Sequence, residues 1–109
     1  MEVIDHGKAL KCECGVIGSD ANDLLKPYNR KIGPDPATLA TALVGGILNN
    51  NSSGMCCGTA QNSYKTIRSI RVVLLDGSIL DTSDQKSIDQ FLKEKPQMVE
   101  DLLQLRKEI

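Results

Sequence analysis

The sequence predicts an α+β fold, with an antiparallel or mixed sheet flanked by helices. Short strands occur in pairs joined by turn residues, which is typical of hairpins. Segments with apolar residues at helical spacing follow these pairs. The chain has 109 residues, with one Phe, two Tyr and no Trp. We therefore expect a single small domain over residues 1–109, with a modest aliphatic core.

The chain opens with a predicted hairpin. Met1 to Ile4 and Ala9 to Cys14 are predicted strands, and Asp5-His6-Gly7-Lys8 between them has turn chemistry. A sheet that begins at the first residue is typical of a segment taken from a larger domain. We therefore expect polypeptide before Met1 in the natural protein.

A short helix and an irregular loop are predicted next. Ser19 or Asp20 can cap a helix from Ala21 to Lys26, which the following proline ends. The loop from Asn29 to Pro36 contains two prolines. Each proline fixes its own φ and keeps the preceding residue out of the helical region. Asp35, which lies between them, therefore has a fixed position.

The stretch from Gly45 to Gly58, GGILNNNSSGMCCG, is the strongest signal for function. It follows an apolar segment, Ala37 to Val44, that we expect to form a helical turn and then extended chain. Glycine allows unusual backbone angles or close approach, while asparagine and serine offer local hydrogen bonds. Gly45-Gly46 is expected to open a helix whose first N–H groups point outward. A structural connector and a loop around a phosphate both agree with this composition.

This stretch lacks two familiar phosphate-binding signatures. The Gly-Lys-Ser/Thr of a P-loop does not follow it, and the G-x-G-x-x-G of a Rossmann fold is absent from it. A phosphate would therefore have to be bound by backbone N–H groups at a helix start or in a nest of amides.

The last third of the chain is predicted as a second hairpin and two helices. Ile67 to Leu75 forms the first strand, Asp76-Gly77 the turn, and Ile79-Leu80 the start of the return strand. Ser83 or Asp84 then caps a helix.

That helix is expected to end near Lys95, and Pro96 begins the last helix. Apolar residues recur on the last helix at helical spacing, at Met98, Leu102, Leu105 and Ile109. The helix is still apolar where the sequence stops, so we expect its partner to lie outside residues 1–109.

Charge and composition exclude several kinds of partner. The chain has 13 Lys and Arg against 14 Asp and Glu, a net charge of −1. It contains no basic block, which argues against nucleic acid or an anionic membrane. No apolar run approaches the roughly twenty residues of a membrane helix, and the N-terminus lacks the features of a signal peptide. We therefore expect a cytoplasmic location and free thiols.

Neither a metal site nor a catalytic group is expected. Cys12-x-Cys14 and Cys56-Cys57 lack the C-x-x-C spacing of a zinc pair, and His6, the single histidine, lies in a predicted turn. The cysteines are instead expected to be buried or half-buried thiols. A nucleophile paired with His6 would lie in an exposed turn, which is a poor place for an active site.

The order of the motifs resembles one flavoprotein family. IGPDPATLATALVGGILNNNSSGMCCGTAQNSY, followed by IRVVLLDGSILDT, is similar to the FAD-binding domain of flavoproteins related to vanillyl-alcohol oxidase and p-cresol methylhydroxylase. Within that family it most resembles bacterial D-lactate dehydrogenases and glycolate-oxidase-like D-2-hydroxyacid dehydrogenases. The similarity extends from about Gly15 to Thr82.

The resemblance implies a fold and a cofactor. The FAD-binding domain of this family, of the p-cresol methylhydroxylase type, has two α+β subdomains that hold FAD between them, and this chain corresponds to the second. Backbone N–H donors can neutralise the diphosphate of FAD without lysine. The resemblance implies FAD contacts at Pro34, Asp35, Gly45, Gly46, Asn51, Ser52, Ser53, Gly54, Val72 and Val73.

Two departures from the family pattern lie beside this implied site. Leu43 stands where a Thr is common just before the glycine pair, which removes one hydroxyl. Met55-Cys56-Cys57 stands where many relatives have other residues, although it resembles the branch of D-lactate dehydrogenases. Asn51-Ser52-Ser53-Gly54 itself matches a segment that is often Asn-Ala-Gly-Gly in relatives.

The resemblance also implies a parent enzyme. Such a chain would belong to a flavin-dependent dehydrogenase for D-lactate or another D-2-hydroxyacid, in which hydride passes from the substrate to flavin N5. The first FAD subdomain is expected before Met1, and the substrate domain, with its catalytic His, after Ile109. Residues 1–109 alone would supply cofactor contacts and no general base, so we expect them to be inactive. Peripheral association of the parent enzyme with the inner membrane stays open.

Two other functions stay open from the residues. A standalone interaction or dimerisation module would use its exposed edges and form a homo-oligomer. A module for a nucleotide other than FAD would be stabilised by ADP or ATP and not by FAD.

Overall fold

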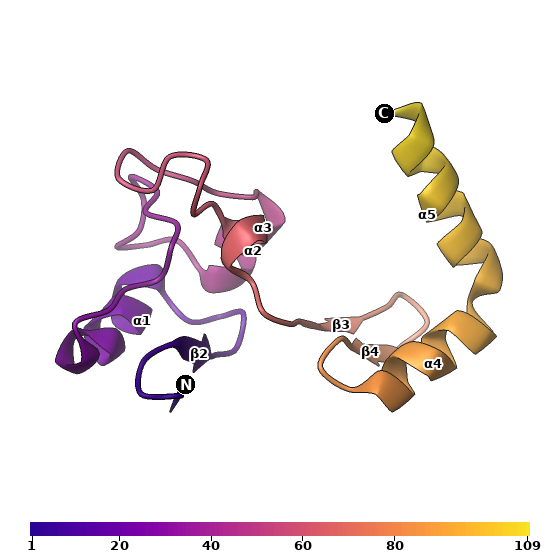
Figure 1. The fold of residues 1–109 in the computed structure, drawn as a ribbon, viewed down its shortest axis with the longest axis horizontal. Coiled ribbons are helices and arrows are strands. Elements are labelled where there is room, and N and C mark those ends of the chain that lie inside the picture. Colours follow the sequence, from indigo (N-terminus) through magenta and orange to yellow (C-terminus); the bar gives the residue numbers. More distant parts are fainter. The chain divides into compact units, whose positions relative to one another are not determined.

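The computed structural model describes every residue from Met1 to Ile109, and these residues form two compact units, Met1–Arg68 and Ser69–Ile109. Each unit combines helices with one antiparallel hairpin, in agreement with the predicted α+β fold (Figure 1). Both sheets are two-stranded and antiparallel, and no mixed sheet forms.

The first unit opens with the predicted hairpin. Strand β1 (Glu2–Ile4) pairs with β2 (Ala9–Lys11), and β2 is shorter than predicted because the chain leaves the hairpin after Lys11. The turn contains Gly7, whose φ of 88° lies in the left-handed region that favours glycine. A Cβ atom on Gly7 would come within 2.6 Å of the Cβ atom of Tyr28. Glycine therefore serves both the turn and the close approach of residue 28.

Helix α1 (Gly18–Leu25) begins earlier than predicted, and a 3-10 turn over Lys26–Tyr28 follows it. The predicted N-caps, Ser19 and Asp20, are wrong. Both residues lie inside the helix, and Ile17 holds the N-cap position without any side-chain hydrogen bond. The first N–H groups of a helix have no partner within the helix, so this start needs acceptors from another segment.

A backbone ladder supplies those acceptors. Residues 14–19 run beside residues 39–45, with Ile17 bridged to Leu43 in antiparallel orientation. Two of its hydrogen bonds start from α1: the N–H of Gly18 donates to the carbonyl oxygen of Ala42 (2.9 Å), and that of Ser19 to Leu39 (3.0 Å). Two run the other way: the N–H of Val44 donates to the carbonyl oxygen of Val16 (2.8 Å), and that of Gly45 to Cys14 (2.9 Å). We call this pairing the 17–43 ladder. It connects the hairpin and α1 to the glycine-rich stretch.

The helix predicted at Gly45-Gly46 is confirmed as α2 (Val44–Asn49), which packs against a second short helix, α3 (Ser63–Thr66). Helix α3 is absent from the sequence-based prediction. Asn62 caps it by accepting the backbone N–H of Lys65 at 3.2 Å. None of the helices in the chain is long and apolar enough to cross a membrane.

The core of the first unit is small. Its buried apolar side chains come from α1, from α2 and from the loop before α3. They are Ala21, Leu25, Ile47 and Cys57, with exposed fractions of 0%, 3%, 4% and 8%. Because few side chains are buried, each large one contributes a substantial share of the hydrophobic stabilisation.

The second unit begins with the other predicted hairpin, in which β3 (Arg71–Val73) pairs with β4 (Ile79–Asp81). The strand predicted from Ile67 to Leu75 is confirmed only at its centre, since Ile67 instead ends α3. Gly77, with a φ of 83°, makes the predicted turn.

Two helices complete this unit. Asp84 caps α4 (Gln85–Glu94) by accepting a backbone N–H of the first turn at 3.0 Å, as predicted. Helix α5 (Pro96–Glu108) has proline in its first turn, where the missing N–H costs nothing. Lys95 between the helices pairs with Asp76 in the hairpin turn, and this hydrogen bond holds the pKa of Asp76 well below its usual range.

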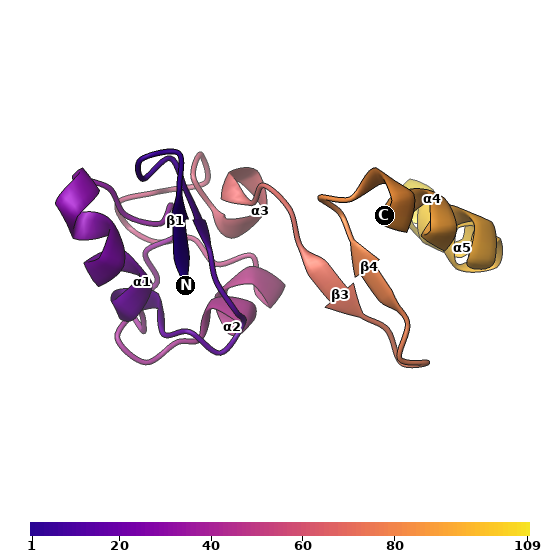
Figure 2. The ribbon, with the colours of Figure 1, turned by 90° about the horizontal axis from the view of Figure 1, so that it is seen from below.

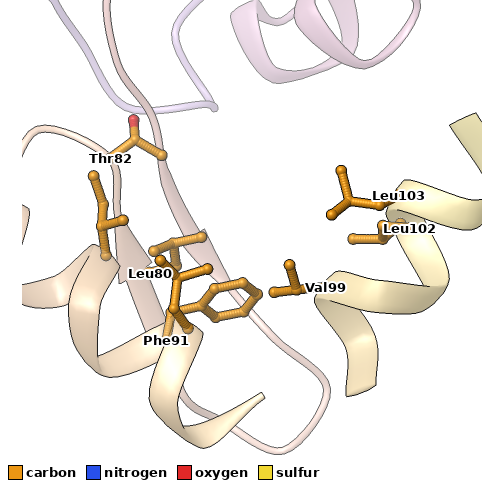
Figure 3. Close-up of a pocket in the computed structure, with 8 residues that line it drawn as sticks. Leu80, Thr82, Phe91, Val99, Leu102 and Leu103 are labelled. Atoms are coloured by element: carbon orange, nitrogen blue, oxygen red, sulfur yellow. The ribbon is translucent and has the colours of Figure 1, made fainter. Parts of the chain in front are cut away.

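Helix α4 packs on β4, and α5 packs on α4 (Figure 2). No side chain of this unit is buried. Instead an open apolar groove of about 360 Å³ runs between the strand and the helices. Figure 3 shows Val99 of α5 facing Phe91 of α4 across this groove. It is lined by Leu80, Thr82, Ile88, Phe91, Leu92, Val99, Leu102 and Leu103.

Adjacent leucines of α1 test the small core. Leu25 is 3% exposed and Leu24 is 37% exposed. Replacing Leu25 by Ala should lower the free energy of unfolding by about 2–5 kcal/mol, because it removes buried methyl groups and leaves a cavity. Leu24→Ala should cost less than about 1 kcal/mol. Urea unfolding of both variants measures the difference. Equal losses would contradict the assignment of the core to the Leu25 face.

Candidate functional site

The carboxylate of Asp35 holds the tip of the glycine-rich stretch. The backbone N–H of Cys56 donates to Oδ2 of Asp35 at 3.0 Å, and the N–H of Cys57 donates to Oδ1 at 3.1 Å. Each carboxylate oxygen thus accepts one amide. We call this pair of hydrogen bonds the Asp35 clamp. Pro34, just before it, is buried.

Gly54 fits this clamp because it lacks a side chain. A Cβ atom on Gly54 would collide with both the carboxylate and the carbonyl oxygen of Asp35. The turn closes when the N–H of Gly58 donates to the Gly54 carbonyl oxygen at 3.1 Å. Gly58 has a φ of 53°, so the turn needs a residue that adopts the left-handed region. Both glycines are therefore required by the shape of the loop itself.

The other end of the loop is anchored to α2 and α3. Asn51 has a φ of 45°, and its side-chain oxygen accepts the backbone N–H of Tyr64 at 3.0 Å. The N–H of Ser52 donates to the carbonyl oxygen of Ile47 at 2.9 Å. The carbonyl oxygen of Ser52 accepts both the N–H and the hydroxyl of buried Ser63, each at 2.9 Å. Asn51 and Ser52 are therefore structural anchors in the first unit.

Ser53, which lies between anchored Ser52 and the clamped Gly54, is free to bind. Ser53 is exposed, and neither its hydroxyl nor its backbone N–H makes a hydrogen bond within the chain. Met55 at the loop tip is fully exposed, with an exposed fraction of 101%. The loop thus carries an accessible hydroxyl and accessible amides on a backbone fixed at both ends.

The two residues of the glycine pair differ in what their backbone amides contact. The N–H groups of Val44 and Gly45 donate into the 17–43 ladder, so the expectation that the first amides of this helix point outward is wrong for them. Gly46 differs: it is exposed, its N–H makes no hydrogen bond within the chain, and a Cβ atom on it would meet nothing within 4 Å. Gly46 therefore offers an amide with open space beside it.

Val72 and Val73, the remaining candidates, lie on β3 in the second unit. Val72 is half-buried, whereas Val73 is 67% exposed. The structure therefore brings Asp35 together with Gly54 and the loop tip within the first unit, whereas the two valines belong to the second unit.

Electrostatics keep the clamp charged and the neighbouring thiol neutral. Partial burial raises the pKa of Asp35, but hydrogen bonds from Cys56 and Cys57 outweigh it and lower that pKa to about 2. Burial and the nearby Asp35 carboxylate raise the pKa of the Cys57 thiol, which donates to the Gly58 carbonyl oxygen at 3.2 Å. The expectation of buried or half-buried thiols is confirmed for Cys57, which is buried, and for Cys12, which is half-buried. It is wrong for Cys14 and Cys56, which are both exposed.

The chemistry of these groups suits binding of a polar ligand. Exposed hydroxyl and amide donors at Ser53 and Gly46 match phosphate and hydroxyl oxygens, which fits FAD. These donors hold and orient a ligand; they are not general acids or bases. The amides of Cys56 and Cys57, which hold the loop on Asp35, are groups that sequence reasoning missed. The one available signal was the fixed position of Asp35 between prolines.

Comparisons with known proteins identify a family for most of the chain. Residues 1–83 match the family model described as FAD binding domain. The match extends beyond the boundary between the two units, so treatment of residues 1–109 as one domain stays a prediction.

Three curated proteins named D-2-hydroxyglutarate dehydrogenase are similar to the chain. The one from Haemophilus influenzae is 31% identical over 80 residues, which is 73% of this chain and 8% of that protein. That from Escherichia coli is 34% identical over 73 residues (67% and 7%). That from Pantoea ananatis is 30% identical over 82 residues (75% and 8%). The chain therefore spans only a small part of these relatives, and no solved structure matches it.

The Asp35 clamp should open at low pH. The pKa of Asp35 is lowered to about 2 in the folded chain, against about 3.9 in an unfolded one. A carboxylate whose pKa is lowered on folding stabilises the folded chain at any pH above its pKa in the unfolded chain. This stabilisation is lost as the pH falls through its pKa in the folded chain. The amides of Cys56 and Cys57 should therefore keep nearly the same protection against hydrogen exchange from pH 7 to about 4. They should lose this protection towards pH 2. Protection lost already near neutral pH would contradict the clamp.

Proposed function

Because the chain belongs to the FAD-binding domain family, we propose that it is the FAD-binding segment of a flavin-dependent D-2-hydroxyacid dehydrogenase. The observation that carries this proposal is the family match over residues 1–83, taken together with relatives that are named as dehydrogenases of one D-2-hydroxyacid. The predicted FAD-binding family is confirmed. The activity is our inference from the relatives.

D-2-hydroxyglutarate is the proposed substrate. It is the acid in the names of the similar proteins, whereas the sequence alone favoured D-lactate or another acid of the same class. The two acids share the hydroxyl-bearing carbon and differ in a second carboxylate. We expect the residues that distinguish them to lie in a substrate domain of the parent enzyme, together with the groups that handle the proton.

Within this chain, the proposed task is to hold the cofactor. FAD, when bound, accepts the hydride. The Gly46 amide and the Ser53 hydroxyl are the best-placed donors for its phosphate and hydroxyl oxygens, since both are exposed and unpaired in the first unit. Val72 and Val73 of β3 are proposed contacts at the adenine end. We assign the chain to the second of two FAD subdomains on the order of its motifs.

The alternatives are not favoured. A module for another nucleotide lacks support, because the family matched is one of FAD-binding domains. A standalone dimerisation module would not need the sequence features that match a family of FAD-binding domains. The same proposal includes a cytoplasmic location. It also holds that residues 1–109 form only part of the groove that binds FAD. FAD should therefore bind tightly only when the remaining subdomain is present.

The activity can be measured on the natural protein that contains residues 1–109. Under anaerobic conditions, D-2-hydroxyglutarate should bleach the visible absorbance of its bound flavin, because the hydride reduces FAD. L-2-hydroxyglutarate is the stereochemical control and should leave the spectrum unchanged, while D-lactate should act more slowly. Faster bleaching by D-lactate would contradict the substrate but support the enzyme class. No bleaching by any D-2-hydroxyacid would contradict the class.

Loss of the Ser53 hydroxyl should weaken FAD binding without unfolding the protein. One hydrogen bond to the cofactor corresponds to about a two- to tenfold change in the dissociation constant. Quenching of flavin fluorescence measures that constant for Ser53→Ala in the same natural protein. Thr59→Ala is a control, because it removes another exposed hydroxyl outside the clamp. Unchanged FAD affinity in Ser53→Ala would remove Ser53 from the binding site.

A further inference from the structure

In the Asp35 clamp, the carboxylate of Asp35 holds the loop, although the sequence predicted that it contacts the cofactor directly. Both of its oxygens already accept backbone amides, from Cys56 and Cys57. Its backbone is constrained by the flanking prolines, and its side chain and carbonyl oxygen lie against the space where Gly54 lacks a Cβ atom. Asp35 is therefore built into the loop as a fixed support.

Ser53 depends on that support because of its place in the chain. The residue before it, Ser52, is held by hydrogen bonds to Ile47 and Ser63. The residue after it, Gly54, packs on Asp35. Ser53 itself makes no hydrogen bond within the chain. Its hydroxyl is therefore aimed only by its neighbours, and release of the clamp would leave it held at one end.

We propose that Asp35 is a positioning residue that orients Ser53 and the neighbouring free amides towards FAD through the clamp on Cys56 and Cys57. This inference rests on the proposed function. In this arrangement Asp35 makes no contact with the cofactor. Its contribution to FAD binding passes through the loop, and in particular through Ser53.

Asp35→Asn is the sharpest substitution for a test. Asparagine has nearly the same shape, but it has one acceptor oxygen and an NH2 group, which is a donor and would oppose one of the two loop amides. One hydrogen bond of the clamp is therefore lost with little change in volume. Asp84→Asn is a matched control, because Asp84 also accepts a backbone N–H but does so at the start of α4.

The experiment is a double-mutant cycle on FAD affinity in the natural protein that contains residues 1–109. The dissociation constant is measured for wild type, Asp35→Asn, Ser53→Ala and the double variant, at a temperature where circular dichroism shows each to be folded. We expect about tenfold weaker binding for Asp35→Asn and about fivefold for Ser53→Ala. The double variant should match Asp35→Asn alone, since Ser53 contributes only when it is oriented. Asp84→Asn should leave the wild-type constant and the effect of Ser53→Ala unchanged.

Hydrogen exchange without FAD provides the second measurement. In Asp35→Asn, the amides of Cys56 and Cys57 should lose protection while those of β1 and β2 keep it. A general loss of stability would instead affect all of them and would not produce coupling to Ser53.

The outcomes separate this inference from the proposed function. If the fold-changes of Asp35→Asn and Ser53→Ala multiply, Asp35 acts independently of Ser53 and the inference is wrong. The same holds if Asp35→Asn leaves FAD affinity or the protection of the loop amides unchanged. In each of these cases wild-type FAD binding still supports the proposed function. If the wild-type protein binds no FAD, both are wrong.

Discussion

The 17–43 ladder is the constraint on which the rest of the first unit depends. It gives α1 a start without a side-chain cap, and it takes up the N–H groups of Val44 and Gly45 at the start of α2. Two helix starts that would each need their own cap are thus satisfied by one pairing of backbone segments. Within the first unit, the start of α2, and with it the start of the loop that carries Ser53, is positioned by this pairing.

The backbone amides of the candidate site fall into two groups, those that donate within the chain and those that do not. Amides at the ends of the loop are used internally, by α2, α3 and the Asp35 carboxylate, while those around Ser53 and at Gly46 make no hydrogen bond within the chain. A loop that binds through backbone amides cannot gain specificity from many side chains, so the shape of its backbone must be fixed in advance. The left-handed residues Asn51 and Gly58 help to fix that shape.

Features encoded by neighbouring residues could be predicted from the sequence. The hairpin turns at Gly7 and Gly77 and the Asp84 cap depend on side chains and φ preferences within a few positions. The family, and with it FAD, followed from the order of the motifs. Features set by distant segments could not be predicted in this way. Ile17 can hold the N-cap position of α1 without a capping side chain because residues 39–45 supply the acceptors for the first amides of the helix.

The same distinction applies to the site. Sequence reasoning identified Asp35, Gly46 and Ser53 as candidates, but it assigned one role to all of them. Only the hydrogen bonds from the amides of Cys56 and Cys57 show that the Asp35 carboxylate is used within the loop. The hydrogen bonds of the clamp have no sequence signature, since their donors are backbone amides that any residue except proline carries.

The Asp35 clamp also has a consequence for the order of folding. Its hydrogen bonds join residues that are 21 and 22 positions apart, whereas β1 and β2 are joined by a short turn. Closing a longer loop costs more chain entropy, and hairpins of adjacent strands form within about 1–10 μs. We therefore expect the N-terminal hairpin to form early and the loop that carries Ser53 to close late. A newly made chain would pass through a stage in which much of its backbone is paired but FAD cannot yet be recognised.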